Sequence, residues 1–199
     1  KRGVIIDLLD NIKINSIKVS DSQNRYLQLE ANKNNVKFAY YISKIFNVNK
    51  KAFLKSLKFF KGLPHRHEIF YKKNNKIIIN DSKATSFEAS KFALKNNKNI
   101  FWIVGGLPKA GDKFQLEEIK KNIIKTYIIG KYMKNFKKYL KGKVDFELCK
   151  TLQNAVASIF KDIKSARDKK ITILLSPASA SYDQFKNFED RGNKFKKLI

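Results

Sequence analysis

KIIINDSKATSFEA, residues 76–89, joins a run of isoleucines to an acid, a cation and hydroxyls, and then to a helix-forming segment. The isoleucines favour a buried strand, and Thr85 and Glu88 have the spacing of a capping box at a helix N-terminus. The same order recurs toward the C-terminus, because short β-branched runs alternate with amphipathic segments. This alternation predicts an α/β domain with a mostly parallel sheet flanked by helices.

Five such strand–helix units can be read from residue 76 onward. The predicted strands, each of ordinary length, are Lys76–Asn80, Ile100–Val104, Thr126–Ile129, Val144–Leu148 and Ile171–Leu175. The predicted helices begin near Ser86, Gln115, Lys131, Leu152 and Tyr182. The second is supported by helical spacing of Phe114, Ile119, Ile123 and Ile124.

The first third of the chain has a different pattern. Residues 1–30 suggest irregular strands, and two amphipathic helices are predicted at Asn35–Phe46 and Lys50–Phe60. The first of them has Phe38, Ala39, Ile42 and Ile45 on one side. This part holds no complete core pattern of its own. We therefore expect residues 1–65 to be the tail of a preceding domain, joined through Gly62-Leu63-Pro64 to the α/β domain of residues 66–199.

The composition limits the class of protein. A hydrophobic content of 43%, with no run of about 20 apolar residues and no leader-like start, predicts a soluble, cytoplasmic protein without a membrane span. Cys149 has no partner for a disulfide or a zinc site and is expected in the core. The formal charge of +26 would suit nucleic acid, but all but five of the 43 basic residues are lysines spread along the chain. That pattern, with many asparagines and isoleucines, indicates A+T-rich coding.

Candidate binding residues follow three of the predicted strands. In parallel sheets, ligands bind beyond the carboxyl ends of the strands, where loops and helix N-termini present N–H groups. The candidates are Asp81, Lys83 and Thr85 after the first strand, Gly105-Gly106 and Lys109 after the second, and the serine-rich segment 176–181 after the fifth. Each set also has a structural explanation, as turn formers, a tight turn or a helix cap.

Three stretches closely resemble signature segments of the Mur ligase family, in the family's order and spacing. They are GLPHR (62–66), NDSKAT (80–85) and LLSPASASYDQFKNFEDRG (174–192). The last stretch points to the members that add D-glutamate. A looser match, ANKNN (31–35), has Ala31 where the family has histidine, and keeps Asn32 and Asn35.

The resemblance implies the Rossmann-like C-terminal domain of a three-domain enzyme, preceded by the end of its central ATP-binding domain. Such an enzyme uses ATP and Mg²⁺ to turn the carboxylate of UDP-N-acetylmuramoyl-L-alanine into an acyl phosphate, which the amine of D-glutamate attacks during peptidoglycan synthesis. By the same resemblance, the D-glutamate ligands are Lys83, Thr85, Lys109, Ser181 and the backbone around Phe188, with a catalytic role for Lys83. The ATP contacts are Asn35 at the base, Arg66 near the phosphates and Asp81 at the ribose.

The family's phosphate-binding loop, its Mg²⁺ ligands and its carbamylated lysine have no counterpart in this sequence. The chain is therefore expected to be part of a longer, monomeric enzyme, to contribute no metal ligand and to be inactive by itself. Two alternatives stay open at this point. One is a nucleic-acid-binding module, whose affinity would fall steeply with salt, and the other is a non-catalytic interaction domain of the same fold.

Overall fold

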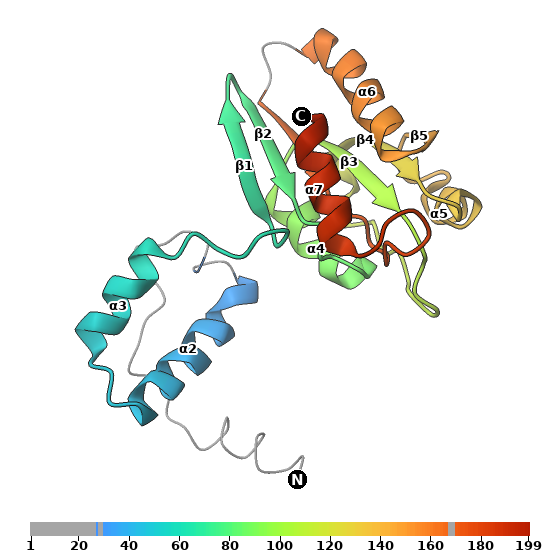
Figure 1. Cartoon of the computed structure of the whole chain (residues 1–199). Coiled ribbons are helices and arrows are strands. Elements are labelled where there is room, and N and C mark those ends of the chain that lie inside the picture. The colour runs from blue at the N-terminus through green and yellow to red at the C-terminus, as the bar shows by residue number, and fades with distance from the viewer. Residues whose placement is uncertain (1–26, 28–29, 167–169) are drawn as a thin grey trace. The chain divides into compact units, whose positions relative to one another are not determined.

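The structure of this chain is a computed structural model that describes residue 27 and residues 30–166 and 170–199. The chain divides into two compact units, one ending at Gly62 and one from Leu63 to Ile199 (Figure 1). The irregular strands predicted for residues 1–30 lie outside the described residues, except at Leu27 and Glu30.

In the described part of the first unit there are two helices, α2 (Glu30–Ile45) and α3 (Lys50–Phe59). The side chain of Asn49 caps α3, because it accepts a hydrogen bond of 2.8 Å from the backbone N–H of Ala52. The buried core of the unit is formed by Leu27, Val36, Tyr40 and Phe53.

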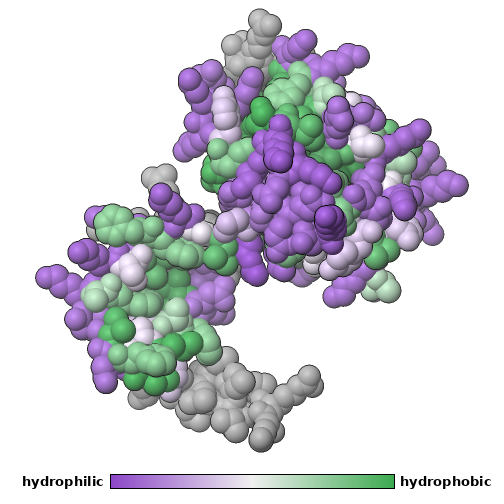
Figure 2. All heavy atoms as spheres, in the orientation of Figure 1, coloured by the Kyte–Doolittle hydropathy of each residue, from purple (hydrophilic) through white to green (hydrophobic). Residues whose placement is uncertain are grey.

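The predicted apolar side of the first helix is not its buried side. Phe38, Ile42 and Ile45 are 44%, 39% and 61% exposed, and Figure 2 shows hydrophobic side chains on the surface of this unit. The reason is the contact between Tyr40 and Phe53, whose ring centroids are 5.1 Å apart, which turns a different face of α2 toward α3.

The second unit is built on a six-stranded sheet in the order β1-β2-β6-β3-β4-β5. The strands are β1 (Glu68–Lys73), β2 (Lys76–Asn80), β3 (Ile100–Gly105), β4 (Ile123–Ile129), β5 (Phe146–Lys150) and β6 (Ile171–Leu175). β1 is antiparallel to β2, and all other neighbours are parallel. The predicted mostly parallel α/β sheet is therefore confirmed, and β2 and β6 have the predicted bounds.

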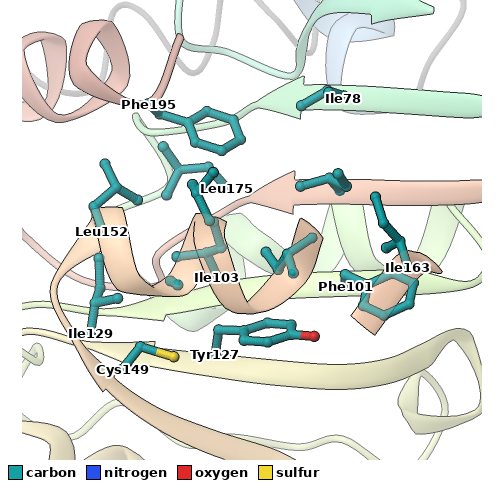
Figure 3. Packing of buried hydrophobic residues seen from close by; sticks show 14 of the residues in the cluster. Ile78, Phe101, Ile103, Tyr127, Ile129, Cys149, Leu152, Ile163, Leu175 and Phe195 are labelled. Carbon is teal, nitrogen blue, oxygen red and sulfur yellow. The ribbon is translucent and has the colours of Figure 1, made fainter. Parts of the chain in front are cut away.

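Helices cover both faces of this sheet. The helices are α4 (Phe87–Asn96), α5 (Met133–Leu140), α6 (Leu152–Asp162) and α7 (Phe188–Leu198). Neighbouring strand residues point to opposite faces, so Ile79 and Leu174 pack in the core under α4 and α5, and Ile78 and Leu175 pack in the core under α6 and α7 (Figure 3). Among the residues described, no helix is long and apolar enough to span a membrane.

One predicted helix is absent and one predicted strand is displaced. Residues from Gln115 form turns and a short 3₁₀ helix, Lys120–Asn122, after which β4 begins. Of the apolar residues that suggested a helix, Phe114 and Ile119 pack in the α4–α5 core from a loop, whereas Ile123 and Ile124 are the first residues of β4. The fourth predicted strand, Val144–Leu148, is found at Phe146–Lys150, because its pairing with β4 begins at Phe146.

One helix start and one helix cap also differ from the prediction. α7 begins at Phe188 rather than near Tyr182, and its cap is Asn187, which accepts the backbone N–H of Asp190 at 2.8 Å. The cap of α4 is Ser86, not the predicted Thr85, because the Ser86 hydroxyl accepts the N–H three residues on at 3.3 Å. A further 3₁₀ helix, Ile163–Ala166, extends α6.

The strand β1 is missed by the sequence reading. It is joined to β2 by Asn74 and Asn75, whose φ angles of 50° and 58° are left-handed. Two left-handed residues close a two-residue hairpin, and asparagine tolerates that conformation. The pairing of β1 with β2 contains a register shift between Ile69 and Tyr71.

His65 belongs to the second unit, whereas the predicted boundary placed it in the first. Its backbone N–H donates to Glu68 at 3.0 Å, and its ring Nδ1 lies 2.9 Å from the side-chain nitrogen of Asn80. The ring packs directly on Gly192, where a Cβ would overlap it. Burial lowers the pKa of His65, and the charge of Lys196 acts in the same direction.

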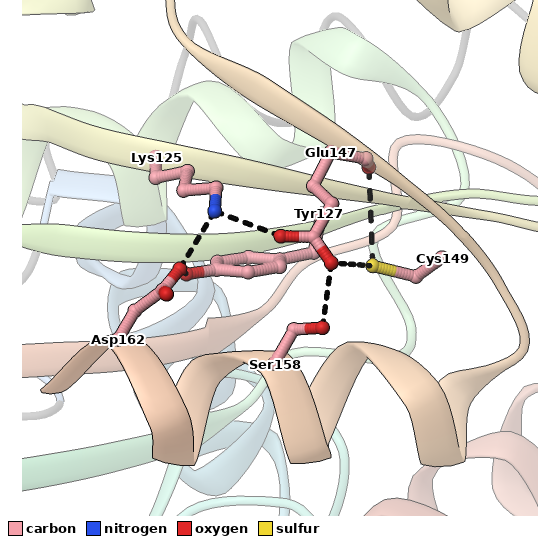
Figure 4. Close-up of polar contacts among 6 residues, drawn as sticks. All are labelled: Lys125, Tyr127, Glu147, Cys149, Ser158 and Asp162. Carbon is pink, nitrogen blue, oxygen red and sulfur yellow. Dashed lines mark hydrogen bonds and ion pairs between the residues drawn. The ribbon is translucent and has the colours of Figure 1, made fainter.

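A polar network joins β4, β5 and α6 (Figure 4). Lys125 Nζ lies 2.8 Å from Glu147 and 2.7 Å from Asp162, which also accepts the Tyr127 hydroxyl at 2.7 Å. The bond from Lys125 lowers the pKa of Glu147. Desolvation alone would raise the pKa of Asp162, but the bonds from Lys125 and Tyr127 outweigh it and lower that pKa.

Cys149 is buried beside Glu147, which confirms the predicted core thiol.

We expect Lys125→Met to lower the free energy of unfolding by about 1–2 kcal/mol at neutral pH, because two half-buried carboxylates lose their cation. Their folded-state pKa values are lowered, so this stabilisation is present above the unfolded pKa of about 4 and is lost as the pH falls through the folded pKa. Urea unfolding of wild type and variant at pH 7 and pH 3 measures the difference. A gap of equal size at both pH values would contradict this account.

Candidate functional site

The loop after β2 carries a buried acid, Asp81, which is 9% exposed. Its Oδ1 accepts the backbone N–H of His67 at 3.0 Å, and its Oδ2 accepts the hydroxyl of Ser176, just after β6, at 2.7 Å. Burial raises the pKa of Asp81 to about 6, although these bonds and the charge of Arg66 act against the rise. Side chains as well as the sheet therefore join the ends of β2 and β6.

Arg191, in the first turns of α7, holds several loops of this edge together. Its side chain is fully buried, and its Nε donates to the hydroxyl of Ser82 at 3.0 Å. Its Nη2 donates to the carbonyls of Ser82 and Ser179, at 2.8 and 3.0 Å. The Ser82 hydroxyl donates in turn to the carbonyl of Phe188 at 2.8 Å. Burial lowers the pKa of Arg191 to about 10, so the guanidinium stays charged at neutral pH.

Arg191 was not among the candidate binding residues predicted from the sequence. The available signal is its rarity, because it is one of five arginines in a chain with 43 basic residues. An arginine that persists among so many lysines indicates a place where a planar fork of donors is needed and a lysine ammonium would not serve.

The paired glycines after β3 allow the close approach of other backbone. At Gly105, with φ of 128°, a Cβ would overlap the carbonyl oxygen of Ile129, and at Gly106, with φ of 136°, it would overlap that of Ala180. Directly after them, Leu107 exchanges two backbone hydrogen bonds with Ala180, of 2.9 and 3.1 Å. The loop that carries Lys109 therefore lies beside the loop after β6.

Three predicted ligands, Lys83, Ser181 and Phe188, lie within this group of bonded loops. Lys83 is half-buried, and its Nζ lies 3.9 Å from the centroid of the Phe188 ring. Ser181 is 2% exposed and follows Ala180 in the bridge described above. The side chain of Phe188 is half-buried, with one ring face against the Lys83 ammonium.

The remaining predicted ligands are exposed. Thr85 lies just before α4. The backbone N–H of Phe87, the first residue of α4, donates to Asp112 at 2.6 Å, and Asp112 lies in the same loop as Lys109. Thr85 and Lys109 therefore come from loops that contact each other. Arg66 is exposed next to the buried Asp81. Asn35 lies on α2, in the first unit.

A hollow of about 820 Å³ is lined by the segment before α7 and by the first turns of that helix. Its lining carries the acids Asp183, Glu189 and Asp190 and the cations Lys186 and Lys194, and it includes neither Lys83 nor Ser181. The predicted D-glutamate ligands therefore do not line this hollow. The described residues also contain no group of three or more His, Cys, Asp or Glu side chains that could hold a metal ion.

Curated proteins similar to the whole chain carry the name UDP-N-acetylmuramoylalanine–D-glutamate ligase. The one from Rickettsia felis is 38% identical over 198 residues, which cover 100% of this chain and 44% of that protein. The one from Wolbachia sp. subsp. Brugia malayi is 36% identical over 199 residues, which cover 100% of this chain and 39% of that protein. This chain thus spans less than half the length of these relatives.

Solved structures share the fold. MurF from Acinetobacter baumannii has a TM-score of 0.62 at 15% identity, over 85% of this chain and 38% of that one. UDP-N-acetylmuramate–alanine ligase MurC from Thermotoga maritima has a TM-score of 0.55 at 15% identity, over 84% of this chain and 37% of that one. No family model matches the chain.

Proposed function

The chain belongs to the Mur ligase family, in its D-glutamate-adding branch, and from this we propose that it forms the D-glutamate-binding part of an ATP-dependent ligase. The proposed reaction joins D-glutamate to UDP-N-acetylmuramoyl-L-alanine through an acyl phosphate, in the cytoplasm, during peptidoglycan synthesis. Residues 1–65 are proposed to be the end of the ATP-binding domain, and residues 66–199 the C-terminal domain.

The observation that carries this proposal is the set of cations and hydroxyls at one edge of the sheet. Lys83, Lys109 and Ser181 come from the loops after β2, β3 and β6, which are bonded to one another. D-glutamate has two carboxylates and one amine, so a site needs cations and hydrogen-bond donors for both ends. When the amine of D-glutamate attacks an acyl phosphate, holding that amine in a fixed orientation accounts for much of the rate acceleration.

The residues proposed for ATP fit only part of what the nucleotide needs. Arg66 is exposed and suits a phosphate. Each carboxylate oxygen of Asp81 accepts one hydrogen bond and has a second acceptor position, which could take a ribose hydroxyl. Asn35 is proposed at the base. Mg²⁺ would neutralise phosphate charge in such a reaction, but no cluster of acids within the described ranges fits it, and we assign its ligands elsewhere in the longer enzyme.

We expect Lys83→Ala to weaken D-glutamate binding about tenfold or more, because a lost charge-assisted contact costs about 1.5–3 kcal/mol. Calorimetric titration of the chain with D-glutamate measures the change. Lys72→Ala, which removes an exposed lysine of β1, gives the same net charge and serves as the control. Binding by Lys83→Ala within about twofold of the control would remove Lys83 from the site.

We also expect the 199-residue chain alone to release no phosphate from ATP when it is given Mg²⁺, D-glutamate and UDP-N-acetylmuramoyl-L-alanine. Phosphoryl transfer depends on a phosphate-cradling loop and on bound metal, and the sequence contains no motif for either. A phosphate-release assay checks this. Substrate-dependent release that survives a second purification would show that the chain is an enzyme by itself.

A further inference from the structure

The Lys83 ammonium lies on the ring of Phe188, and the proposed binding of D-glutamate by Lys83 does not explain this contact. The 3.9 Å between Lys83 Nζ and the centroid of the Phe188 ring is well inside the range of about 6 Å for a cation held on an aromatic face. The lysine comes from the loop after β2 and the ring from the start of α7. The contact therefore joins two elements of the proposed site through a side chain.

The ring of Phe188 is fixed independently of Lys83. The backbone carbonyl of Phe188 accepts the Ser82 hydroxyl at 2.8 Å, and that hydroxyl accepts a hydrogen bond of 3.0 Å from Arg191 Nε. The His65 ring meets the Phe188 ring edge-on, with centroids 6.1 Å apart and an angle of 77°. His65 is buried, which favours its neutral form, so it brings no second cation to the ring at neutral pH.

The backbone of Lys83 is also fixed, because its N–H donates to the carbonyl of His65 at 3.0 Å. Its side chain, however, has four rotatable carbon–carbon bonds and loses much rotamer freedom whenever the ammonium is held in one place. When the ammonium rests on the Phe188 ring, the Lys83 side chain loses this freedom before any ligand binds. A carboxylate attracts the ammonium more strongly than a ring face does, so the ring does not compete with an anionic ligand.

We propose that Phe188 is a positioning residue whose ring holds the Lys83 ammonium where it meets a carboxylate of D-glutamate. This inference rests on the proposed function, in which Lys83 binds D-glutamate and Phe188 contributes only backbone. It assigns a role to the aromatic side chain itself, which the resemblance to other ligases does not assign.

The test compares Phe188→Leu, which keeps apolar bulk but removes the aromatic face, with Phe188→Tyr, which keeps that face. In the NMR spectrum of the wild-type chain, the ring current should move the Lys83 ε-methylene protons upfield, and Phe188→Leu should abolish this shift. Calorimetric titration should show D-glutamate binding weakened about two- to fivefold in Phe188→Leu and unchanged in Phe188→Tyr.

A double-mutant cycle separates this role from a merely structural one. In the Lys83→Ala background, Phe188→Leu should cause no further loss of D-glutamate affinity, because the ring then has no ammonium to hold. An equal loss in both backgrounds would mean that Phe188 acts through packing, and the inference would be wrong.

Three further results would also overturn the inference, and each has a different consequence for the proposed function. If wild type binds D-glutamate and Phe188→Leu binds it equally well, the ring does not position Lys83, while the proposed function stands. If wild type shows the upfield shift but binds no D-glutamate, the proposed function fails and takes the positioning role with it. An absent shift in wild type rejects the inference whether or not the variants fold.

Discussion

Arg191→Met should destabilise the second unit by about 2–4 kcal/mol. The variant loses all the bonds that Arg191 donates, and it leaves the buried carbonyls of Ser82 and Ser179 without these donors. Each stranded buried carbonyl costs about 1–3 kcal/mol, and the variant strands two of them, which sets the size of the expected loss. The midpoint of urea unfolding, followed by circular dichroism, measures the loss.

Two other variants make this result specific to the buried guanidinium. Arg66→Met removes an exposed arginine and is expected to change the free energy of unfolding by less than about 0.5 kcal/mol. Arg191→Lys keeps a charge but not the fork of donors, and should recover only part of the loss. If Arg191→Met and Arg66→Met unfold alike, the bonds of Arg191 do not stabilise the fold.

Gly105→Ala should cost about 3 kcal/mol or more, a large fraction of the stability of an ordinary domain. The φ angle of 128° is nearly restricted to glycine, and a Cβ would overlap the carbonyl oxygen of Ile129. Ile129 is the partner of Gly105 in the parallel ladder, so neither backbone can move without breaking sheet hydrogen bonds. Thermal unfolding monitored by circular dichroism provides the measurement.

Gly142→Ala is the matched control for backbone strain. Gly142 also has a positive φ, of 74°, but nothing lies within 4 Å of the position where its Cβ would be. It should therefore cost only about 1 kcal/mol, the ordinary penalty of a left-handed alanine. Equal losses in the two variants would mean that the sheet yields to the added methyl group at Gly105.

Short-range patterns predicted the bounds of β2 and β6, in which three isoleucines (β2) and the run Ile-Thr-Ile-Leu-Leu (β6) pack between two layers of helices. They did less well for β4, which begins at Ile123 rather than at the predicted Thr126. The loops after β2, β3 and β6 could be predicted as a group, since parallel strands place their carboxyl ends on one edge.

The misses have a common physical cause, which is that long-range contacts decided the local structure. Phe114 and Ile119 have helical spacing but pack from a loop into a core formed by distant strands. Arg191 gives no periodic signal, because its partners, Ser82 and Ser179, lie in other loops. Only Asn74-Asn75 was a local signal that could have revealed β1, since two such residues suit a tight hairpin.

The hairpin strand β1 also affects how copies of this protein meet. Without it, the parallel strand β2 would end the sheet with a row of unpaired backbone groups, which is a template for pairing between chains. β1 covers that row, and its own outer edge is interrupted by the register shift near Tyr71 and carries the exposed Lys72 and Lys73. A bent, charged border of this kind is a poor template for another strand, so this edge of the sheet is protected from edge-to-edge aggregation.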